Sequence, residues 1–207
     1  MHRRLRLSLL ATTLIALSAT DVVAQRPQGP GRPTAGIFGG YTGPTGDFGD
    51  EVGNGWHVGA LIKMRLYGAL DGRIDGTYAK FGKKDIPGEE FAFHTDANTA
   101  FATFDAHINL GPDSAAYPGD NSVSPHIVLG LGVYQLDYKV TCSGQCTDFI
   151  GAEKKTHWGL NVGAGATAPI AGLRTFFEAR YHRIMRDTFE DGGSRAMFLA
   201  SVGIKFR

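Results

Sequence analysis

Charged and ionisable side chains occur at every second position in several segments of the chain, and they carry both signs of charge. Carboxylates beside Arg, Lys or His can form ion pairs, bind metals or transfer protons, so these positions are the first candidates for a site. We expect them to satisfy one another in a buried polar network, because a buried charge needs a partner. The predicted network comprises Lys63, Arg65, Arg73, Asp75, Asp105, His107, Glu178, Arg180 and His182.

Five histidines fall on the same polar positions, namely His57, His107, His126, His157 and His182. One interpretation is a metal-binding or proton-sensing site formed by His57, His157 and His182, which the strand directions place near one end. The other is that each imidazole is a hydrogen-bonded member of the polar network, and we adopt it. We therefore predict no metal site and no cofactor.

Ser201 and His182 share the polar face of the last two segments, as a nucleophile and its base would. Antiparallel pairing across residues 186–194 sets Ser201 beside Glu178, four residues from His182. At about 3.3 Å per residue the separation is roughly 13 Å, which is far beyond hydrogen-bond contact. We predict that the protein is not an enzyme and has no catalytic residue.

Cys142 and Cys146 are the only two cysteines, and they lie four positions apart in a polar segment. In an oxidising compartment such a pair forms a disulfide that stiffens a loop. Further metal ligands do not cluster beside them in the sequence. We expect a structural disulfide.

The N-terminus predicts export. Residues 1–6 are positively charged, residues 7–19 are apolar, and small residues precede a cleavage position after Ala24. We expect a signal peptide over residues 1–24, a Pro- and Gly-rich flexible lead-in over 25–33, and one domain over 34–207. The chain has 21 Lys or Arg and 20 Asp or Glu, a formal net charge of +1. Without a basic surface, nucleic-acid binding is excluded.

The elements that position the polar side chains are strands, because the apolar pattern has a period of two. From Trp56 to Leu66 the even positions are apolar and the odd ones carry Gly, His and charge. With no helical segment between them, the strands pair as antiparallel neighbours. The eight predicted strands cover residues 34–42, 56–66, 70–81, 100–110, 125–138, 157–168, 173–185 and 196–206.

The predicted connections alternate in length. Short turns follow the second and sixth strands, whereas long polar loops cover residues 43–55, 82–96, 139–156 and 186–194. The connection over 111–124 is an exception, because it is long although it lies at the same end of the barrel as the short turns. Loops 43–55 and 186–194 are acidic and Gly-rich, and we expect them to be solvated. Short turns at one end and four long loops at the other are typical of outer-membrane barrels.

Alternation alone also fits a soluble barrel with an apolar interior. Three features favour apolar side chains on the outside: glycines on the polar face, which a narrow lumen needs; charges of both signs there; and aromatic residues near strand ends. The predicted aromatic girdle comprises Trp56, Tyr78, Tyr138, Trp158, Tyr181 and Phe206. The fold class is therefore an all-β, eight-stranded antiparallel up-and-down transmembrane barrel.

The chain resembles the small eight-stranded outer-membrane β-barrels, the OmpA/OmpX/OmpW-like group, over about residues 34–207. The resemblance is carried by Gly-Trp-His-Val-Gly-Ala at 55–60, Phe-Glu-Ala-Arg-Tyr-His at 177–182 and the closing strand 198–206. Members of the group often end on a Phe read by the barrel-assembly machinery, whereas here Phe206 is followed by Arg207.

The resemblance implies a place in the outer membrane of a Gram-negative-type bacterium, with membrane lipid and lipopolysaccharide as partners. We expect a monomer with a structural or surface-interaction role, a plugged polar lumen and four external loops. The alternative is an OmpW-like barrel that binds or passes a small apolar molecule or ions. In that case Phe101, Phe176 and Leu199 are the inward apolar residues available to line a pocket.

Overall fold

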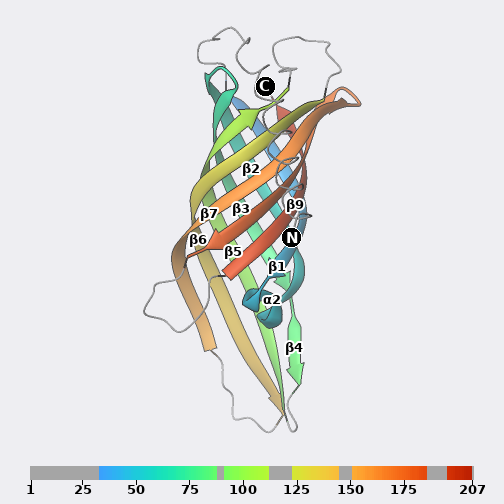
Figure 1. Cartoon of the computed structure of the whole chain (residues 1–207). Coiled ribbons are helices and arrows are strands. Elements are labelled where there is room, and N and C mark those ends of the chain that lie inside the picture. The colour runs from blue at the N-terminus through green and yellow to red at the C-terminus, as the bar shows by residue number, and fades with distance from the viewer. Residues whose placement is uncertain (1–32, 88–90, 112–122, 145–150, 186–194, 207) are drawn as a thin grey trace, which may run out of the picture.

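The computed structural model describes residues 33–87, 91–111, 123–144, 151–185 and 195–206 (Figure 1). The predicted signal peptide, residues 1–24, and the lead-in up to residue 32 lie outside these ranges. So do the predicted loop 186–194 and nearly all of the connection 111–124. Within the described residues, no helix has the length and apolar character to cross a membrane.

The chain forms one closed antiparallel barrel. Its sheet order is β3-β2-β1-β9-β8-β7-β6-β5-β4, and an additional β3–β5 pairing closes the ring, so that eight strands make the wall and β4 pairs only with β5. The elements are β1 (Thr34–Thr45), α2 (Asp47–Glu51), β2 (Gly53–Tyr67), β3 (Leu70–Gly82), β4 (Lys84–Pro87), β5 (Phe91–Asn109), β6 (Ser124–Gly144), β7 (Gly151–Ile170), β8 (Leu173–Ile184) and β9 (Arg195–Phe206).

The prediction of long loops over residues 82–96 and 139–156 is wrong, because strand pairing continues into both segments. β5 and β6 pair from Phe91 opposite Gly144, and β6 and β7 pair as far as Val140 opposite Gly151. Most of 82–96 and 139–156 is therefore strand. These stretches lack apolar alternation because both of their faces lie beyond the apolar wall, yet backbone pairing needs no side-chain pattern. In Figure 1, β4 projects beyond the end of the barrel that carries α2.

The predicted loop 43–55 contains the short helix α2, so the expectation that no helical segment separates the strands is also wrong. Gly46 starts the turn with a positive φ of 61°. The side chains of Phe48 and Val52 are each 1% exposed, and Glu51 pairs with Arg195 of β9 at 3.0 Å. The segment is not a solvated loop, because burial of its two apolar side chains holds it against the rim.

The predicted orientation of the two faces is confirmed. Trp56, Phe104 and Val162 are 49%, 57% and 49% exposed on the outside, whereas Arg73 and Glu178 are 1% and 5% exposed on the inside. The wall is thus inverted relative to a soluble protein.

The girdle prediction is wrong for Tyr138 alone among its members. Trp56, Tyr78, Trp158, Tyr181 and Phe206 are exposed on the outer face. Tyr138 instead packs against the buried apolar cluster inside the barrel. The period of two explains this, because the inward set of β6 is the even-numbered one that begins at His126.

Candidate functional site

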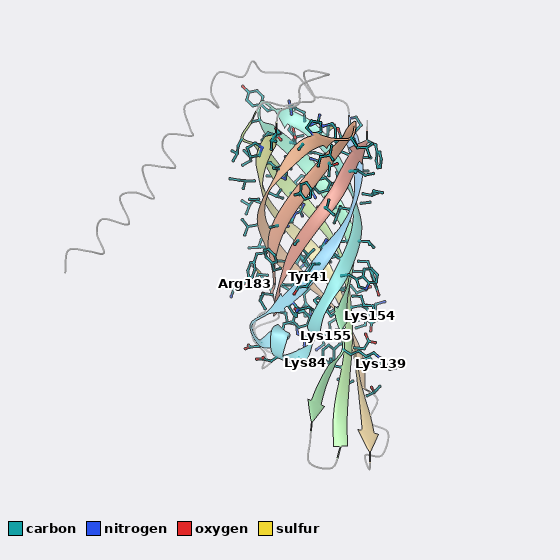
Figure 2. The ribbon with its side chains drawn as sticks, turned by 90° about the vertical axis from the view of Figure 1, so that its right-hand side faces the viewer. Tyr41, Lys84, Lys139, Lys154, Lys155 and Arg183 are labelled. Carbon is teal, nitrogen blue, oxygen red and sulfur yellow. The ribbon has the colours of Figure 1, made fainter. Side chains whose placement is uncertain are left out.

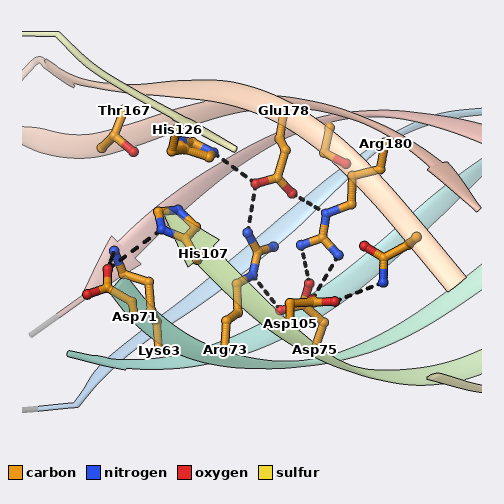
Figure 3. Close-up of polar contacts among 12 residues, drawn as sticks. Lys63, Asp71, Arg73, Asp75, Asp105, His107, His126, Thr167, Glu178 and Arg180 are labelled. Atoms are coloured by element: carbon orange, nitrogen blue, oxygen red, sulfur yellow. Dashed lines mark hydrogen bonds and ion pairs between the residues drawn. The ribbon is translucent and has the colours of Figure 1, made fainter. Parts of the chain in front are cut away.

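The lumen holds a compact cluster of ion pairs (Figure 3). Arg180 of β8 contacts three carboxylates: Asp75 at 2.5 Å, Asp105 at 3.1 Å and Glu178 at 2.5 Å. Arg73 of β3 contacts Asp75 at 2.7 Å and reaches Glu178 at 2.7 Å. We call these five residues the central ion cluster. It joins β3, β5 and β8 across the barrel.

Neutral side chains complete the central ion cluster. Asn161 donates to Asp105 at 2.8 Å, and Thr103 donates to the same carboxylate at 2.9 Å. With two guanidinium groups against three carboxylates, these donors supply hydrogen bonds that the arginines leave unmade. Buried ion pairs stabilise a fold only when such further bonds satisfy the remaining lone pairs.

A second polar group lies nearer the chain termini. Asp71 accepts from Lys63 at 2.6 Å, from Arg65 at 2.9 Å and from Asn109 at 2.9 Å. The Lys63 and Arg65 side chains are 14% exposed, so this group faces the opening. In strand register, Thr34 pairs with Lys63, which fixes this opening at the N-terminal end of β1.

Apolar side chains fill the opposite end of the lumen. One cluster at this end includes Phe48, Phe81, Phe101, Tyr134 and Leu199. A separate smaller cluster of Phe38, Leu61 and Phe176 lies toward the chain termini, where Lys205 lies over the Phe176 ring at 5.0 Å. The guanidinium of Arg195 lies over the rings of Phe48 and Tyr138, at 5.4 and 5.2 Å. We call the first cluster the apolar plug. It includes Phe101 and Leu199, so the three residues proposed for an apolar pocket are not brought together.

The inward histidines have different partners. His57 bonds Thr42 at 3.0 Å and Ser201 at 2.8 Å, and His182 bonds the Tyr134 hydroxyl at 2.9 Å. His157 is half-buried. Among the described residues, His57, His157 and His182 therefore do not form a ligand set.

His126 and His107 form a stacked pair. Their ring centroids lie 4.4 Å apart, and His126 contacts Glu178 at 2.9 Å. His107 lies 3.6 Å from Asp71, beyond hydrogen-bond distance, and both of its ring nitrogens lack a partner within the described part of the chain. The pair thus lies between the central ion cluster and the Asp71 group.

The contact between Ser201 and His57 was missed from the sequence. Ser201 does lie beside Glu178 in register, as predicted. Across the other edge of β9, however, Gly40 of β1 pairs with both Ser201 and His57. Because Gly40 has no side chain, the serine and the imidazole meet over it.

The nine predicted network residues all lie inside the barrel, but they divide among groups. Arg73, Asp75, Asp105, Glu178 and Arg180 make the central ion cluster, whereas Lys63 and Arg65 join through Asp71. His182 bonds Tyr134 instead. Asp71, Asn161 and Tyr134 were absent from the predicted set, although their alternating positions carried the signal. The predicted Cys142–Cys146 disulfide lies outside the described side chains.

No protein-family model and no curated protein sequence matches the chain. Solved structures do. Neisserial surface protein A is 15% identical, with a TM-score of 0.53 over 86% of this chain and 98% of that one. The N-terminal β-barrel domain of OprF from Pseudomonas aeruginosa is 14% identical, with a TM-score of 0.47 over 87% and 100%. Ail of Yersinia pestis is 14% identical, with a TM-score of 0.43 over 85% and 100%.

The TM-score to Neisserial surface protein A is high enough to compare folds, and the similarity extends over the closed antiparallel ring described above. The inverted wall and the ion-paired lumen are what a barrel in lipid requires. The fold of this chain is therefore that of the small eight-stranded outer-membrane β-barrels, the group that its sequence resembles.

Proposed function

We propose that the protein is a non-enzymatic, lipid-embedded scaffold of the bacterial outer membrane, with a closed lumen and an external end made by α2, β4 and the extended strands β5–β7. The observation that carries the proposal is the inverted wall: large apolar side chains are exposed, while arginines and carboxylates are buried. Each strand of the wall has at least 12 residues, enough to cross the apolar layer. We further propose a monomer that the barrel-assembly machinery inserts.

The closed lumen is supported by two barriers in series. The central ion cluster occupies the middle, and the apolar plug occupies the end near α2. An eight-stranded barrel is only wide enough for its own side chains. Transport of an apolar molecule is disfavoured, because Phe101, Phe176 and Leu199 are at most 6% exposed, and Phe176 lies in a different cluster from the other two.

We propose lipopolysaccharide as the lipid partner on the external side. Lys139, Lys154 and Arg183 are exposed near the end that carries α2 (Figure 2). Lys154 lies outside the apolar wall, on the same face of β7 as the exposed Trp158 four residues further on. A row of cations just above an aromatic belt is suited to anionic headgroup phosphates.

The test of the proposal is electrophoresis of the membrane fraction with and without boiling. A closed barrel resists unboiled SDS and migrates faster, and purified protein in planar bilayers gives no large stable conductance. Recovery in the soluble periplasmic fraction overturns the membrane assignment. A large, stable single-channel current overturns the closed lumen but leaves the membrane assignment intact.

A further inference from the structure

Three potential metal ligands converge in the lumen at the edge of the central ion cluster: His107 of β5, His126 of β6, and Glu178 of β8, which is itself a member of that cluster. They are 0%, 2% and 5% exposed. One ligand atom from each lies within 4.8 Å of the others, and this is the only such trio found among the described residues. In Figure 3 both imidazoles lie on the side of Glu178 away from Asp105.

A second observation points to a missing ligand. Both ring nitrogens of His107 and Nδ1 of His126 are buried without a hydrogen-bond partner in the described part of the chain. Buried polar atoms are rarely left unpaired, because their desolvation is then uncompensated. Elsewhere in the lumen, His57 has partners on both ring nitrogens. Nε2 of His182 is also unpaired, but among the described histidines only His107 lacks a partner on both ring nitrogens, and it lies beside His126 and Glu178.

We propose that His107, His126 and Glu178 bind a divalent first-row transition-metal ion of the Zn²⁺ class. Two imidazoles and one carboxylate are a ligand set typical of zinc with one open position, which a water molecule would fill. Lys63 and Arg73 lie nearby, so an ion held by charge alone, such as Ca²⁺ or Mg²⁺, is disfavoured. Donation from imidazole nitrogen must supply the affinity, which favours Zn²⁺, Co²⁺, Ni²⁺ or Cu²⁺.

Binding requires only a small rearrangement. Ligand atoms around tetrahedral Zn²⁺ lie about 3.4 Å apart, since each bond is about 2.0–2.2 Å. Nε2 of His126 and Glu178 already lie 2.9 Å apart, and the ion would replace the hydrogen bond between them. His107 breaks no hydrogen bond when it moves toward them. Arg73 also donates to the same oxygen of Glu178, but it keeps Asp75, and Glu178 keeps Arg180.

The three ligands lie close to one end of the barrel. His107 is two residues from the end of β5 at Asn109, and His126 is two residues from the start of β6 at Ser124. At about 3.3 Å per residue, the site lies roughly 7 Å inside the opening at the chain termini. Because Glu178 comes from β8, a bound ion would join strands that are not neighbours in the sheet.

The experiment is a Co²⁺ titration of tag-free, chelator-treated protein in detergent, followed by its visible d–d absorption and by competition with Zn²⁺. We expect saturable binding of one ion, with affinity reduced more than about 10-fold in His107→Gln and His126→Gln, because loss of a ligand costs more than loss of its supporting hydrogen bond. His182→Gln is the matched control, since His182 is also buried and points inward but is not one of the three proposed ligands.

Heat-modifiable migration checks that each variant folds. If the His107 and His126 variants do not fold, X-ray absorption of the Zn²⁺-loaded wild-type protein decides, because the site requires scattering from two imidazoles. No uptake of Co²⁺ by wild-type protein, equal uptake by folded His107→Gln or His126→Gln, or fewer than two imidazole ligands overturns the proposal. None of these results bears on the scaffold role or on the closed lumen.

Discussion

Arg73 and Glu178 meet at 2.7 Å across the lumen although they are 105 residues apart in the chain. Their strands, β3 and β8, are not neighbours in the sheet, so only closure of the ring brings the two side chains together. Both are almost completely buried, and each also contacts a second oppositely charged residue. The pair therefore links opposite walls of the barrel and helps to fill its centre.

Removal of Arg180 is expected to destabilise the barrel strongly. Arg180→Ala leaves Asp75 and Glu178 with Arg73 as their remaining guanidinium and removes the ion pair of Asp105. Breaking a buried pair costs about 3–5 kcal/mol. The measurement is urea unfolding in lipid vesicles, with tryptophan fluorescence as the signal. Arg183→Ala is the matched control, because Arg183 lies on the same strand but is exposed; its expected effect is within about 0.5 kcal/mol. Equal effects of the two substitutions would contradict the central ion cluster.

A charge on the outer wall is expected to be costly in proportion to its depth. Leu131 is 50% exposed in the middle of the apolar face of β6, and Leu131→Arg should lower unfolding free energy by about 2–4 kcal/mol in vesicles. Gln135 lies four residues further along the same outward face, near the interface. Gln135→Arg should therefore lower the unfolding free energy by only about 0–1 kcal/mol. If Leu131→Arg is tolerated as well as Gln135→Arg, the wall does not face lipid.

Two glycines should differ sharply in their tolerance of a methyl group. A Cβ at Gly130 collides with the Asp105 carboxylate and with backbone of β5, whereas a Cβ at Gly76 meets no atom within 4 Å. Gly130→Ala should therefore displace Asp105 from Arg180 and cost about 1–3 kcal/mol, as overpacking does. Gly76→Ala should be nearly neutral. The two variants are compared by the same vesicle unfolding assay, and a neutral Gly130→Ala would show that the lumen has room to adjust.

Phe48 is expected to hold α2 on the rim. Its ring is 1% exposed, packs edge-on against Phe81 at 4.9 Å and lies under the Arg195 guanidinium. Phe48→Ala should cost about 3–5 kcal/mol of local stability, measured as faster amide hydrogen exchange across α2 and the adjoining end of β9. Asp50→Ala, on the exposed side of the same helix, is the control. Since the central ion cluster remains, the Phe48 variant should still give no large conductance, and a large current would locate the barrier at the rim.

The period of two in the sequence was sufficient to predict the strands of the wall, their antiparallel order and which side chains face inward. This succeeds because successive strand residues point to opposite faces, so a local pattern reports orientation directly. Glycines and charges of both signs on one face also indicated a filled lumen. The aromatic at 138 was assigned to the wrong face because its residue type was given more weight than its parity.

The period of two did not predict the strand ends, whose position depends on backbone pairing alone. The strand ends around Phe91 and Val140 carry no apolar alternation, since they are hydrogen-bonded through backbone groups outside the apolar wall. The helix α2 is five residues long and is held by contacts with β3 and β9 rather than by its own propensity. Such short elements acquire their stability from tertiary packing.

The sequence by itself determined a barrel wall with apolar side chains outside and ionisable side chains inside. Only the tertiary structure decided which inward residues meet. The register across β1 brings Ser201 to His57 rather than to His182, and ring closure brings Glu178 to Arg73 and to His126. The physical reason is that parity is fixed within one strand, whereas contacts across a lumen depend on the register of every pairing around the ring.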